Sequence, residues 1–403
     1  MLKLSSSFDL QIKTMTLFGF WDPGKNSWYF WYSIFMWTVF VFFFYFFQLM
    51  FIVKASNFSD ISAGLYMFSS GIFCLIKLLN LKINRSRIEK LFARIDSSLF
   101  QPQSPEELSV LKKSQWRAKW LTRSLYICCP FTGFFYAIAP FLGTRENIKI
   151  FMAAWYPWSV NTTSTFMLTY LFEILGLCIG CAYIIPCDTI IYCLCILING
   201  QIECLGIRLK ELGHEKQETF KNIVDDQEKI RIDKYANELS IRKGSVFYGE
   251  IVKCIILHKK ILEFVGELQD IYSKIIFFQF VVSIIIYCMT GYEIIMLQSE
   301  GNIELVTRLL YMFTLLVELF LLCLTGNEII YTSRTLTNQL FNCNFQNFDK
   351  PTLNVLLIFM TMTTKDMILE GHSFMTVELS LDAFMKIIKL SYSFFTFLKS
   401  MQK

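Results

Sequence analysis

Residues that could carry out catalysis or hold a metal are few and scattered in this chain. Its 403 residues include only three histidines, His214, His258 and His372, and none of them stands near an acid-rich motif. Catalysis needs a nucleophile, a base or a metal cluster brought together. Cys178 and Cys181 have the spacing of a metal-binding or redox pair, but they lie in an apolar run without a second pair. We therefore predict no enzyme, no metal and no cofactor.

Charged side chains inside long apolar runs are a second kind of candidate. A polar group that faces hydrocarbon goes unsatisfied, so it tends to face a protein interior or a water-lined path. Lys77 and Asp188 lie where they can reach the membrane surface. We expect Glu173 and Glu318 to form an interior pair or to line a polar path.

Membrane-spanning helices have to position these residues. The chain is 54% hydrophobic, 17% aromatic and only 18% charged, whereas soluble domains carry about a quarter charged residues. The net charge of +5 is not gathered into one basic module, which argues against a nucleic-acid partner. Nearly all of the thirteen cysteines lie in apolar runs or beside basic loops, where free thiols are the better interpretation. The composition predicts an all-α membrane protein in the lipid bilayer.

Seven apolar runs are long enough to cross a bilayer, which requires about 20 residues in a helix. They are residues 28–53, 61–81, 122–142, 165–198, 271–297, 305–330 and 377–398. Around them we expect an amino tail at 1–27, four spans within 28–198, a helical extension with a charged loop at 199–270, two spans within 271–330, a cytosolic segment at 331–376 and a seventh helix with an outer tail at 377–403.

The basic residues predict a cytoplasmic amino terminus, because positive connections stay on the cytoplasmic side. Of 38 Lys and Arg, 27 lie in the amino tail and the alternate connections on its side, and 5 lie on the other side. Seven spans then place the carboxyl terminus outside, which argues against a G-protein-coupled receptor. Sequons at Asn57 and Asn161 fall in outer connections, and we expect glycosylation of at least one of them.

Helices four and five are expected to continue into the cytosol. Apolar residues keep a helical spacing up to Leu212, and a similar stripe runs from Ile251 into the fifth span. Such stripes must be buried, and an extension of the sixth span together with residues 354–367 offers an apolar partner. We interpret this bundle as an assembly surface between subunits, with an intrachain packing unit as the alternative.

The carboxyl-terminal motifs resemble those of the insect odorant receptors. Gly371-His-Ser-Phe, Leu379-Ser-Leu-Asp-Ala-Phe and Ser391-Tyr-Ser-Phe-Phe-Thr are similar to the end of that family, and further matches begin at His258. Phe345 stands where many members carry Trp, and the first half matches by topology and length only. Gustatory receptors are the related alternative, but they usually end in Thr-Tyr followed by Gln-Phe, which this chain lacks.

The resemblance implies a ligand-gated, nonselective cation channel that requires no G protein. In that family an odorant-tuning subunit forms a tetramer with a shared co-receptor around one central pore, in the plasma membrane of a sensory-neuron dendrite. The seventh helix is split, which here implies a cytosolic anchor part at 354–370 and a pore-lining part at 377–398. A secondary transporter of a small solute is the alternative class, but neither internal repeats nor matching broken helices are evident.

The resemblance also implies a pocket for a small apolar odorant in the outer half of spans two to six. Such a site is mostly apolar and carries one or two polar groups. Helix depth favours Tyr66, Ser69, Ser70, Phe73, Phe131, Phe135, Ile138, Phe172, Gly176, Phe277, Phe280, Val281, Tyr311 and Met312, with Trp158 covering the site from an outer connection. Any one phenylalanine can instead face lipid or pack against a neighbouring helix.

Alignment from the chain end implies pore residues in the last helix. Phe397 and Ser400 would form the outer constriction, with Ser393 and Thr396 below them. A phenylalanine at a constriction closes a pore by dewetting. The alternative is a lipid-facing Phe397 on the final turn.

Overall fold

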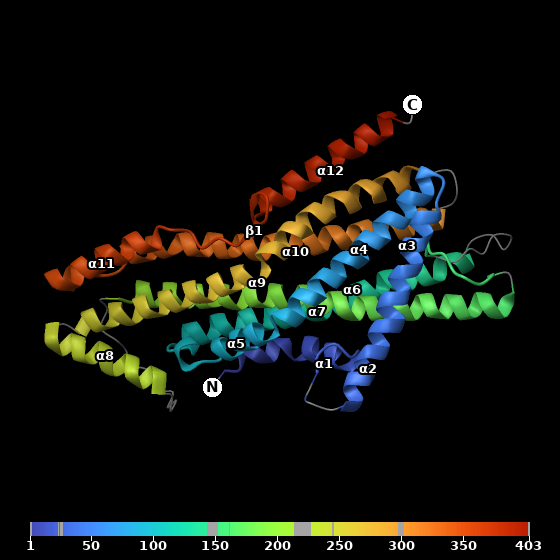
Figure 1. Cartoon of the computed structure of the whole chain (residues 1–403). Coiled ribbons are helices and arrows are strands. Elements are labelled where there is room, and N and C mark those ends of the chain that lie inside the picture. Colours follow the sequence, from blue (N-terminus) through green and yellow to red (C-terminus); the bar gives the residue numbers. More distant parts are fainter. Residues whose placement is uncertain are drawn as a thin grey trace.

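The structure of the chain is a computed structural model. It describes residues 2–22, 24, 27–142, 152–160, 162–212, 227–243, 246–296 and 302–401. Helices account for nearly all of its secondary structure, which confirms the predicted all-helical class (Figure 1). Within the described part, five helical stretches are long and apolar enough to cross a membrane: Ser27–Lys54, Asp60–Ile83, Thr163–Lys210, Phe247–Ile294 and Leu305–Phe341.

The amino-terminal half supplies the helices that flank the bundle. Its elements are η1 (Leu4–Phe8), α1 (Asp9–Leu17), α2 (Ser27–Trp37), η2 (Thr38–Phe43), α3 (Phe44–Lys54), α4 (Phe58–Ile83), α5 (Arg85–Ile95), η3 (Ser98–Phe100) and α6 (Pro105–Leu142). The segment η2 is π-helical and joins α2 to α3 without a break. Because a π-helical turn bonds residue i to i+5 instead of i+4, the faces of α2 and α3 do not follow one 3.6-residue repeat.

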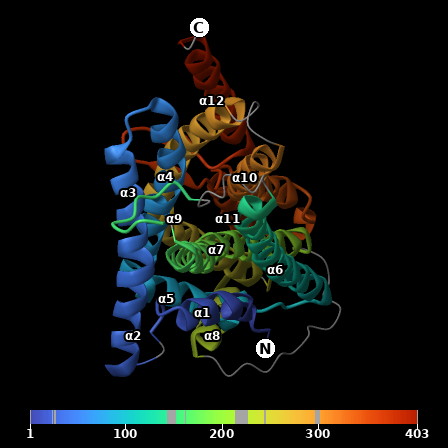
Figure 2. The same cartoon turned by 90° about the vertical axis from the view of Figure 1, so that its right-hand side faces the viewer.

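Helix α7 (Thr163–Lys210) lies at the centre of the molecule. Figure 2 shows it nearly end-on, with α1, α6, α9 and α10 around it. Every residue from Ile185 to Ile202 is buried. A helix that is apolar all round is stable only when it is enclosed, and here α6, α9, α10 and α1 contact it along its length.

Helices α7 and α9 are much longer than one membrane crossing, as predicted. Helix α7 has 48 residues and α9 (Val246–Met296) has 51, whereas a crossing needs about 20. The remaining helical elements of this half are α8 (Gln227–Lys243), α10 (Asn302–Phe341), η6 (Phe345–Asn347) and α11 (Lys350–Thr363). Helix α11 packs against α9 and α10 at the end of the molecule remote from α3 (Figure 1), so the predicted bundle forms within the chain.

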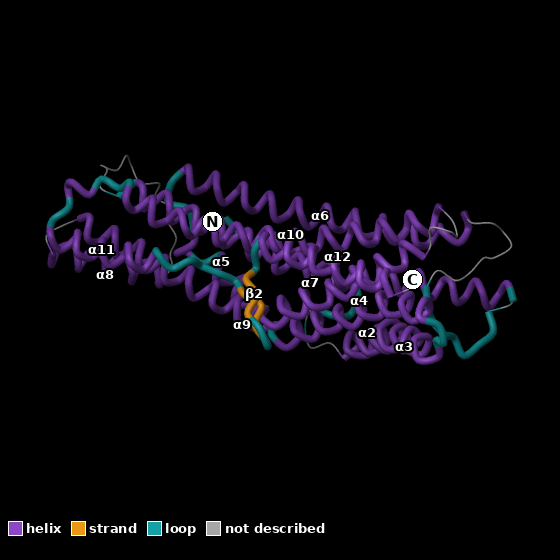
Figure 3. Tube along the Cα trace, turned by 90° about the horizontal axis from the view of Figure 1, so that it is seen from above, coloured by secondary structure: helices purple, strands orange, loops and turns teal. Residues whose placement is uncertain are grey.

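A short hairpin separates α11 from the last helix, α12 (Leu381–Met401). Strands β1 (Glu370–His372) and β2 (Thr376–Glu378) pair antiparallel beside α9 (Figure 3). The prediction that the last helix starts at residue 377 is wrong, because Val377 pairs with Gly371 in this hairpin. The helix starts later, where the Ser380 Oγ accepts a hydrogen bond from the backbone N–H of Ala383 at 3.3 Å.

The hairpin is tied to α9 by hydrogen bonds. The Gln269 amide donates to the Glu370 carbonyl at 2.7 Å and accepts from the Glu370 N–H at 2.8 Å. The Ser273 hydroxyl accepts from the His372 N–H at 3.0 Å. A Cβ on Gly371 would lie 2.7 Å from the backbone nitrogen of Phe277, so only glycine permits this close approach.

All thirteen cysteines are free thiols, as the sequence predicted. Nine of them are buried, and four of these nine lie in α7: Cys187, Cys193, Cys195 and Cys204. They act here as small apolar side chains.

Candidate functional site

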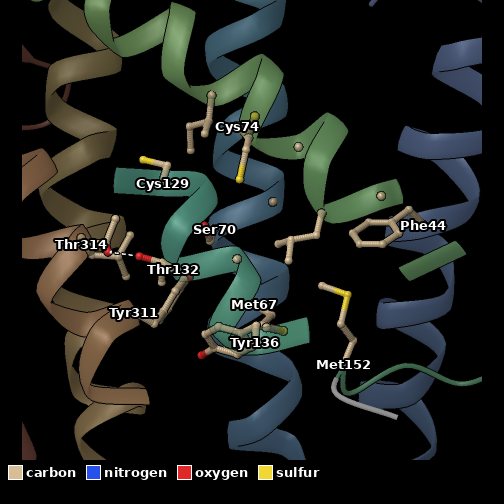
Figure 4. A pocket seen from close by; sticks show the side chains of 18 of the residues that line it. Phe44, Met67, Ser70, Cys74, Cys129, Thr132, Tyr136, Met152, Tyr311 and Thr314 are labelled. Carbon is tan, nitrogen blue, oxygen red and sulfur yellow. Dashed lines mark hydrogen bonds between the residues drawn. The ribbon is translucent and has the colours of Figure 1, made fainter. Parts of the chain in front are cut away.

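A cavity of ≈ 170 Å³ lies in the half of the helix bundle that is remote from α11. Its walls come from α3, α4, α6, α7 and α10, and Met152, in the segment before α7, adds one side (Figure 4). A water molecule needs about 10–15 Å³ of such volume. The cavity therefore has room for a small organic molecule.

The cavity walls are mostly apolar. Their apolar side chains are Phe44, Tyr45, Met67, Cys74, Cys129, Tyr136, Met152, Leu177, Cys181, Ile184, Tyr311 and Leu315. Glycines make the close approach of α3 possible. A Cβ on Gly176 would overlap the ring of Phe44, and a Cβ on Gly71 would overlap the ring of Tyr45. The shape of the cavity thus depends on two glycines that face aromatic rings.

Few polar groups reach the cavity. The hydroxyls of Thr132 in α6 and Thr314 in α10 lie 3.0 Å apart and join the two helices across one wall (Figure 4). Ser70, Gln48 and Glu318 supply the other non-aromatic polar side chains of the lining. A mostly apolar site with a small number of placed polar groups is typical of a binding site for a small molecule.

Three of the predicted ligand residues line this cavity: Ser70, Gly176 and Tyr311. Tyr66 is fully buried behind Tyr311, with the two ring centroids 5.5 Å apart. Phe73 and Ile138 line two adjoining cavities. Their contact with a ligand stays a prediction.

The other predicted ligand residues lie outside the cavity lining. Phe131 and Val281 are exposed on the outside of the bundle, and Phe135 packs against Phe131. Phe172 packs behind Phe44, with ring centroids 6.0 Å apart. The remaining ones outside the lining are Ser69, Phe277, Phe280, Met312 and Trp158. Helix α9, which holds Phe277, Phe280 and Val281, does not contribute to this cavity.

The predicted pocket comprises spans two to six, yet α3, which belongs to the first span, provides one wall of the cavity. Phe44, Tyr45 and Gln48 come from this helix. A signal was present in the sequence, because Gln48 is a polar side chain within the apolar run 39–53. A polar side chain in an apolar run tends to face the protein interior, and Gln48, which is 2% exposed, does so.

The segment before α7 closes one side of the cavity. The Tyr156 hydroxyl donates to Glu173 Oε1 at 2.8 Å, and the indole N–H of Trp158 donates to the Thr169 hydroxyl at 2.9 Å. Both rings pack against Phe47 of α3. Burial and the neighbouring Glu173 carboxylate raise the pKa of the Tyr156 hydroxyl, which therefore remains a donor.

A buried ion cluster lies at the inner end of the cavity. Lys77 Nζ is 2.6 Å from Asp188 Oδ1 and 2.8 Å from Glu318 Oε1, and the Lys77 side chain is only 5% exposed. The predictions that Lys77 and Asp188 reach the membrane surface and that Glu173 pairs with Glu318 are wrong. Helices α4, α7 and α10 meet at this depth, so the opposite charges compensate one another away from water.

The predicted pore and glycosylation residues are described only in part. Ser393 and Thr396 are exposed on α12, whereas the side chains of Phe397 and Ser400 lie outside the described residues. Asn57 is exposed just before α4. Asn161 lies outside the described residues.

The fold defines a multi-pass helical membrane protein with a cavity between its helices. The family model described as "7tm Odorant receptor" matches residues 57–392. The chain therefore belongs to the insect odorant receptor family, as its carboxyl-terminal motifs predicted. The family consists of receptor channels and not of enzymes, which confirms the prediction of no enzyme.

Individual relatives agree with this assignment. The chain is 28% identical to "Odorant receptor Or1" of Anopheles gambiae over 98% of its own length and 95% of the relative. It is 22% identical to "Odorant receptor 46a, isoform A" of Drosophila melanogaster, over 85% and 83% of the two chains. The solved structure of the olfactory receptor OR5 from Machilis hrabei in complex with eugenol shares the fold, with a TM-score of 0.79, 15% identity and coverage of 99% and 98%.

Proposed function

We propose that the chain is the odorant-binding subunit of a ligand-gated, nonselective cation channel that it forms with a co-receptor. The observation that carries this proposal is the mostly apolar cavity between α3, α4, α6, α7 and α10. A small volatile molecule is apolar and offers one or two polar atoms, which is what this lining can accept. The structure of OR5 with eugenol supports an odorant as the ligand class.

The proposed topology has seven spans, with a cytoplasmic amino terminus and the cavity in the outer half of the membrane. Helix α6 and helix α12 supply the two crossings beyond the five apolar stretches. The split seventh helix then consists of α11 in the cytosol and α12 in the membrane. The proposed localisation is the plasma membrane of a sensory-neuron dendrite.

The outward faces of α11 and α12 support assembly with other subunits. On α11, Leu357 and Ile358 are 60% and 61% exposed, although α11 lies in the proposed cytosolic region. Apolar side chains in water at this density mark a protein interface. On α12, Tyr392 and Phe394 are exposed as well.

Helix α10 connects the cavity with the proposed pore helix. It lines the cavity from Tyr311 to Glu318, and two residues further on the ring of Phe320 packs edge-on to Phe384 of α12 at 5.6 Å. A ligand that fits the cavity better in one arrangement of α10 shifts the channel toward that arrangement. The shift cannot exceed the difference between the two binding free energies.

The test is electrical recording from cells that express the chain with the co-receptor, the chain alone or the co-receptor alone. We expect volatiles to open a nonselective cation current within milliseconds, only in cells that hold both proteins, and with G-protein signalling blocked. Saturable solute uptake without such a current would instead indicate a transporter. A panel of volatiles in the same assay identifies the odorant.

A further inference from the structure

A second apolar space lies between α6 and α7, beside the cavity. It has a volume of ≈ 500 Å³, and its lining includes Phe134 and Phe141 of α6 and Cys178 of α7. Phe134 and Phe141 are 57% and 52% exposed, and Cys178 is exposed as well. In the proposed topology these side chains face lipid. The space is therefore a groove that opens into the bilayer, and we call it the α6–α7 groove.

The groove and the cavity share a thin wall. Three residues line both spaces: Gly133 of α6, and Leu177 and Cys181 of α7. Gly133 has no side chain and Cys181 has a short one, so Leu177 supplies most of the wall. A Cβ on Gly133 would lie 3.4 Å from Leu177 Cδ2, which places the end of the Leu177 side chain directly against the backbone of α6. A leucine side chain makes no hydrogen bonds, so a change of rotamer is enough to move it aside.

Helix α6 is less constrained beside this wall than elsewhere. Pro130 lies within the helix and has no N–H, so the carbonyl of Tyr126 lacks its usual helical partner. Gly133 follows after about one turn and gives the backbone additional freedom. A small shift of α6 away from Leu177 therefore breaks few backbone hydrogen bonds.

The side of the cavity toward the segment before α7 is closed more firmly. Tyr156 and Trp158 each donate a hydrogen bond to α7, and both rings pack against Phe47. Entry on that side would break these contacts, whereas a movement of Leu177 breaks apolar contacts only. A volatile ligand is also concentrated in lipid, because the transfer of apolar surface out of water is favourable.

We propose that the α6–α7 groove is a second binding site, which takes the odorant from the bilayer and passes it beside Leu177 into the cavity. This inference rests on the proposed function, since it concerns how the ligand reaches the same cavity. The occupant is the odorant itself, because the groove is apolar and continuous with the cavity through a wall one side chain thick.

The experiment narrows the groove and records the current of the receptor with its co-receptor during rapid application and removal of an odorant. The variants are Ala137→Phe in α6 and Cys178→Phe in α7, singly and together. Both residues line the groove and neither lines the cavity. We expect the double variant to slow the onset and the decay of the current by at least about threefold each, and the single variants to slow both by less.

The half-maximal concentration should change less than about twofold in these variants. Narrowing an entry route slows association and dissociation by the same factor, so the Kd, which is their ratio, stays the same. The slowing should also increase from small to bulky odorants, because it arises from the width of the groove. Altered channel gating would instead slow all odorants by one factor.

The matched control is Ile127→Phe combined with Cys128→Phe. Both residues are exposed on α6, and neither lines the groove or the cavity. The onset and decay of the current should be those of the unaltered receptor. These rates do not depend on the number of receptors at the surface, so a lower expression of any variant does not affect the comparison.

The outcomes separate the inference from the proposed function. Unchanged rates in the groove variants would overturn the inference and would leave the groove to a lipid acyl chain. Equal slowing in the control, one factor for all odorants, or a loss of potency at unchanged rates would overturn it too, while the proposed function would stand. A receptor pair that conducts with no volatile of any class would overturn both.

Discussion

The two halves of α7 are packed in opposite ways. In its first half, Gly176 and Gly180 line the cavity, and Leu168 is 68% exposed on the outside of the bundle. In its second half, every residue from Ile185 to Ile202 is buried among other helices. One helix thus contributes to a site with room for a ligand and to a tightly packed centre, and the ion cluster at Asp188 stands at the boundary between them.

Free volume lies in the half of α7 where Gly176 and Gly180 face the cavity, whereas Gly200 and Gly206 of the packed half are in close contact with other side chains. The packed half holds the helices in place, so the cavity half can keep an unfilled space without collapse. Three substitutions test this division, one at the boundary, one at the outer closure and one in the cavity wall.

The largest effect is expected from Lys77→Met at the boundary. Removal of the ammonium leaves the buried Asp188 and the partly buried Glu318 without their cation, and breaking a buried pair in this way costs about 3–5 kcal/mol. We expect loss of the folded receptor from the cell surface and an earlier unfolding transition in detergent. Fluorescence-detected size-exclusion chromatography after heating measures the amount of folded receptor and the temperature at which it unfolds.

Lys90→Met is the control for that experiment. Lys90 is exposed on α5, so its substitution should leave surface expression and thermal unfolding unchanged. Normal expression and stability of Lys77→Met would contradict the view that the cluster secures the boundary.

An intermediate effect is expected from Tyr156→Phe at the outer closure. The substitution removes the donor to Glu173 Oε1, and an intramolecular hydrogen bond contributes about 0.5–1.5 kcal/mol. The segment that contains Met152 should then open more often. Hydrogen exchange of residues 152–158 should become faster, while exchange in the packed half of α7 stays the same.

The control variant is Tyr235→Phe, because Tyr235 lies exposed on α8. Unaltered exchange of residues 152–158 in Tyr156→Phe would show that the hydroxyl does not hold this segment closed.

The smallest effects are expected in the cavity wall, where two glycines of α7 form a matched pair. A Cβ on Gly176 would overlap the Phe44 ring, whereas a Cβ on Gly180 has no atom within 4 Å. Gly176→Ala must displace Phe44 and should weaken odorant potency about tenfold. Gly180→Ala should change potency less than about threefold, because one methyl group fits the open space. Equal effects of the two variants on the concentration–response curve would disprove the proposed wall.

Much of the fold could be predicted because a chain in lipid must satisfy its backbone hydrogen-bonding groups internally. A helix satisfies its own backbone groups, so long apolar runs had to become helices. The apolar stripe of α9 continues without a breaker, and its unbroken helix follows from that continuity, whereas α7 remains one helix although it contains Pro186. The carboxyl-terminal motifs at Gly371 and Leu379 identified the family, and Gly371 proves to need its lack of a side chain.

The site was harder to predict because it depends on how helices are rotated against one another. The π-helical turn Thr38–Phe43 changes the face that α3 turns inward, so the position of Gln48 could not be extrapolated from α2. The salt bridges of Lys77 join residues 111 and 241 positions away in the chain. Spacing along one helix carries no information on such contacts, although the presence of the charges signalled that partners had to exist.

The hairpin that precedes α12 is hydrogen-bonded to Gln269 and Ser273 of α9, so it holds the first turn of α12 in place. Helix α12 has 21 residues and is therefore about 30 Å long. A rotation of α12 by about 5° about its first turn moves its last turn sideways by about 3 Å. If α12 lines the proposed pore, a movement about the hairpin therefore widens the pore most at the end of α12 remote from the hairpin and least beside it.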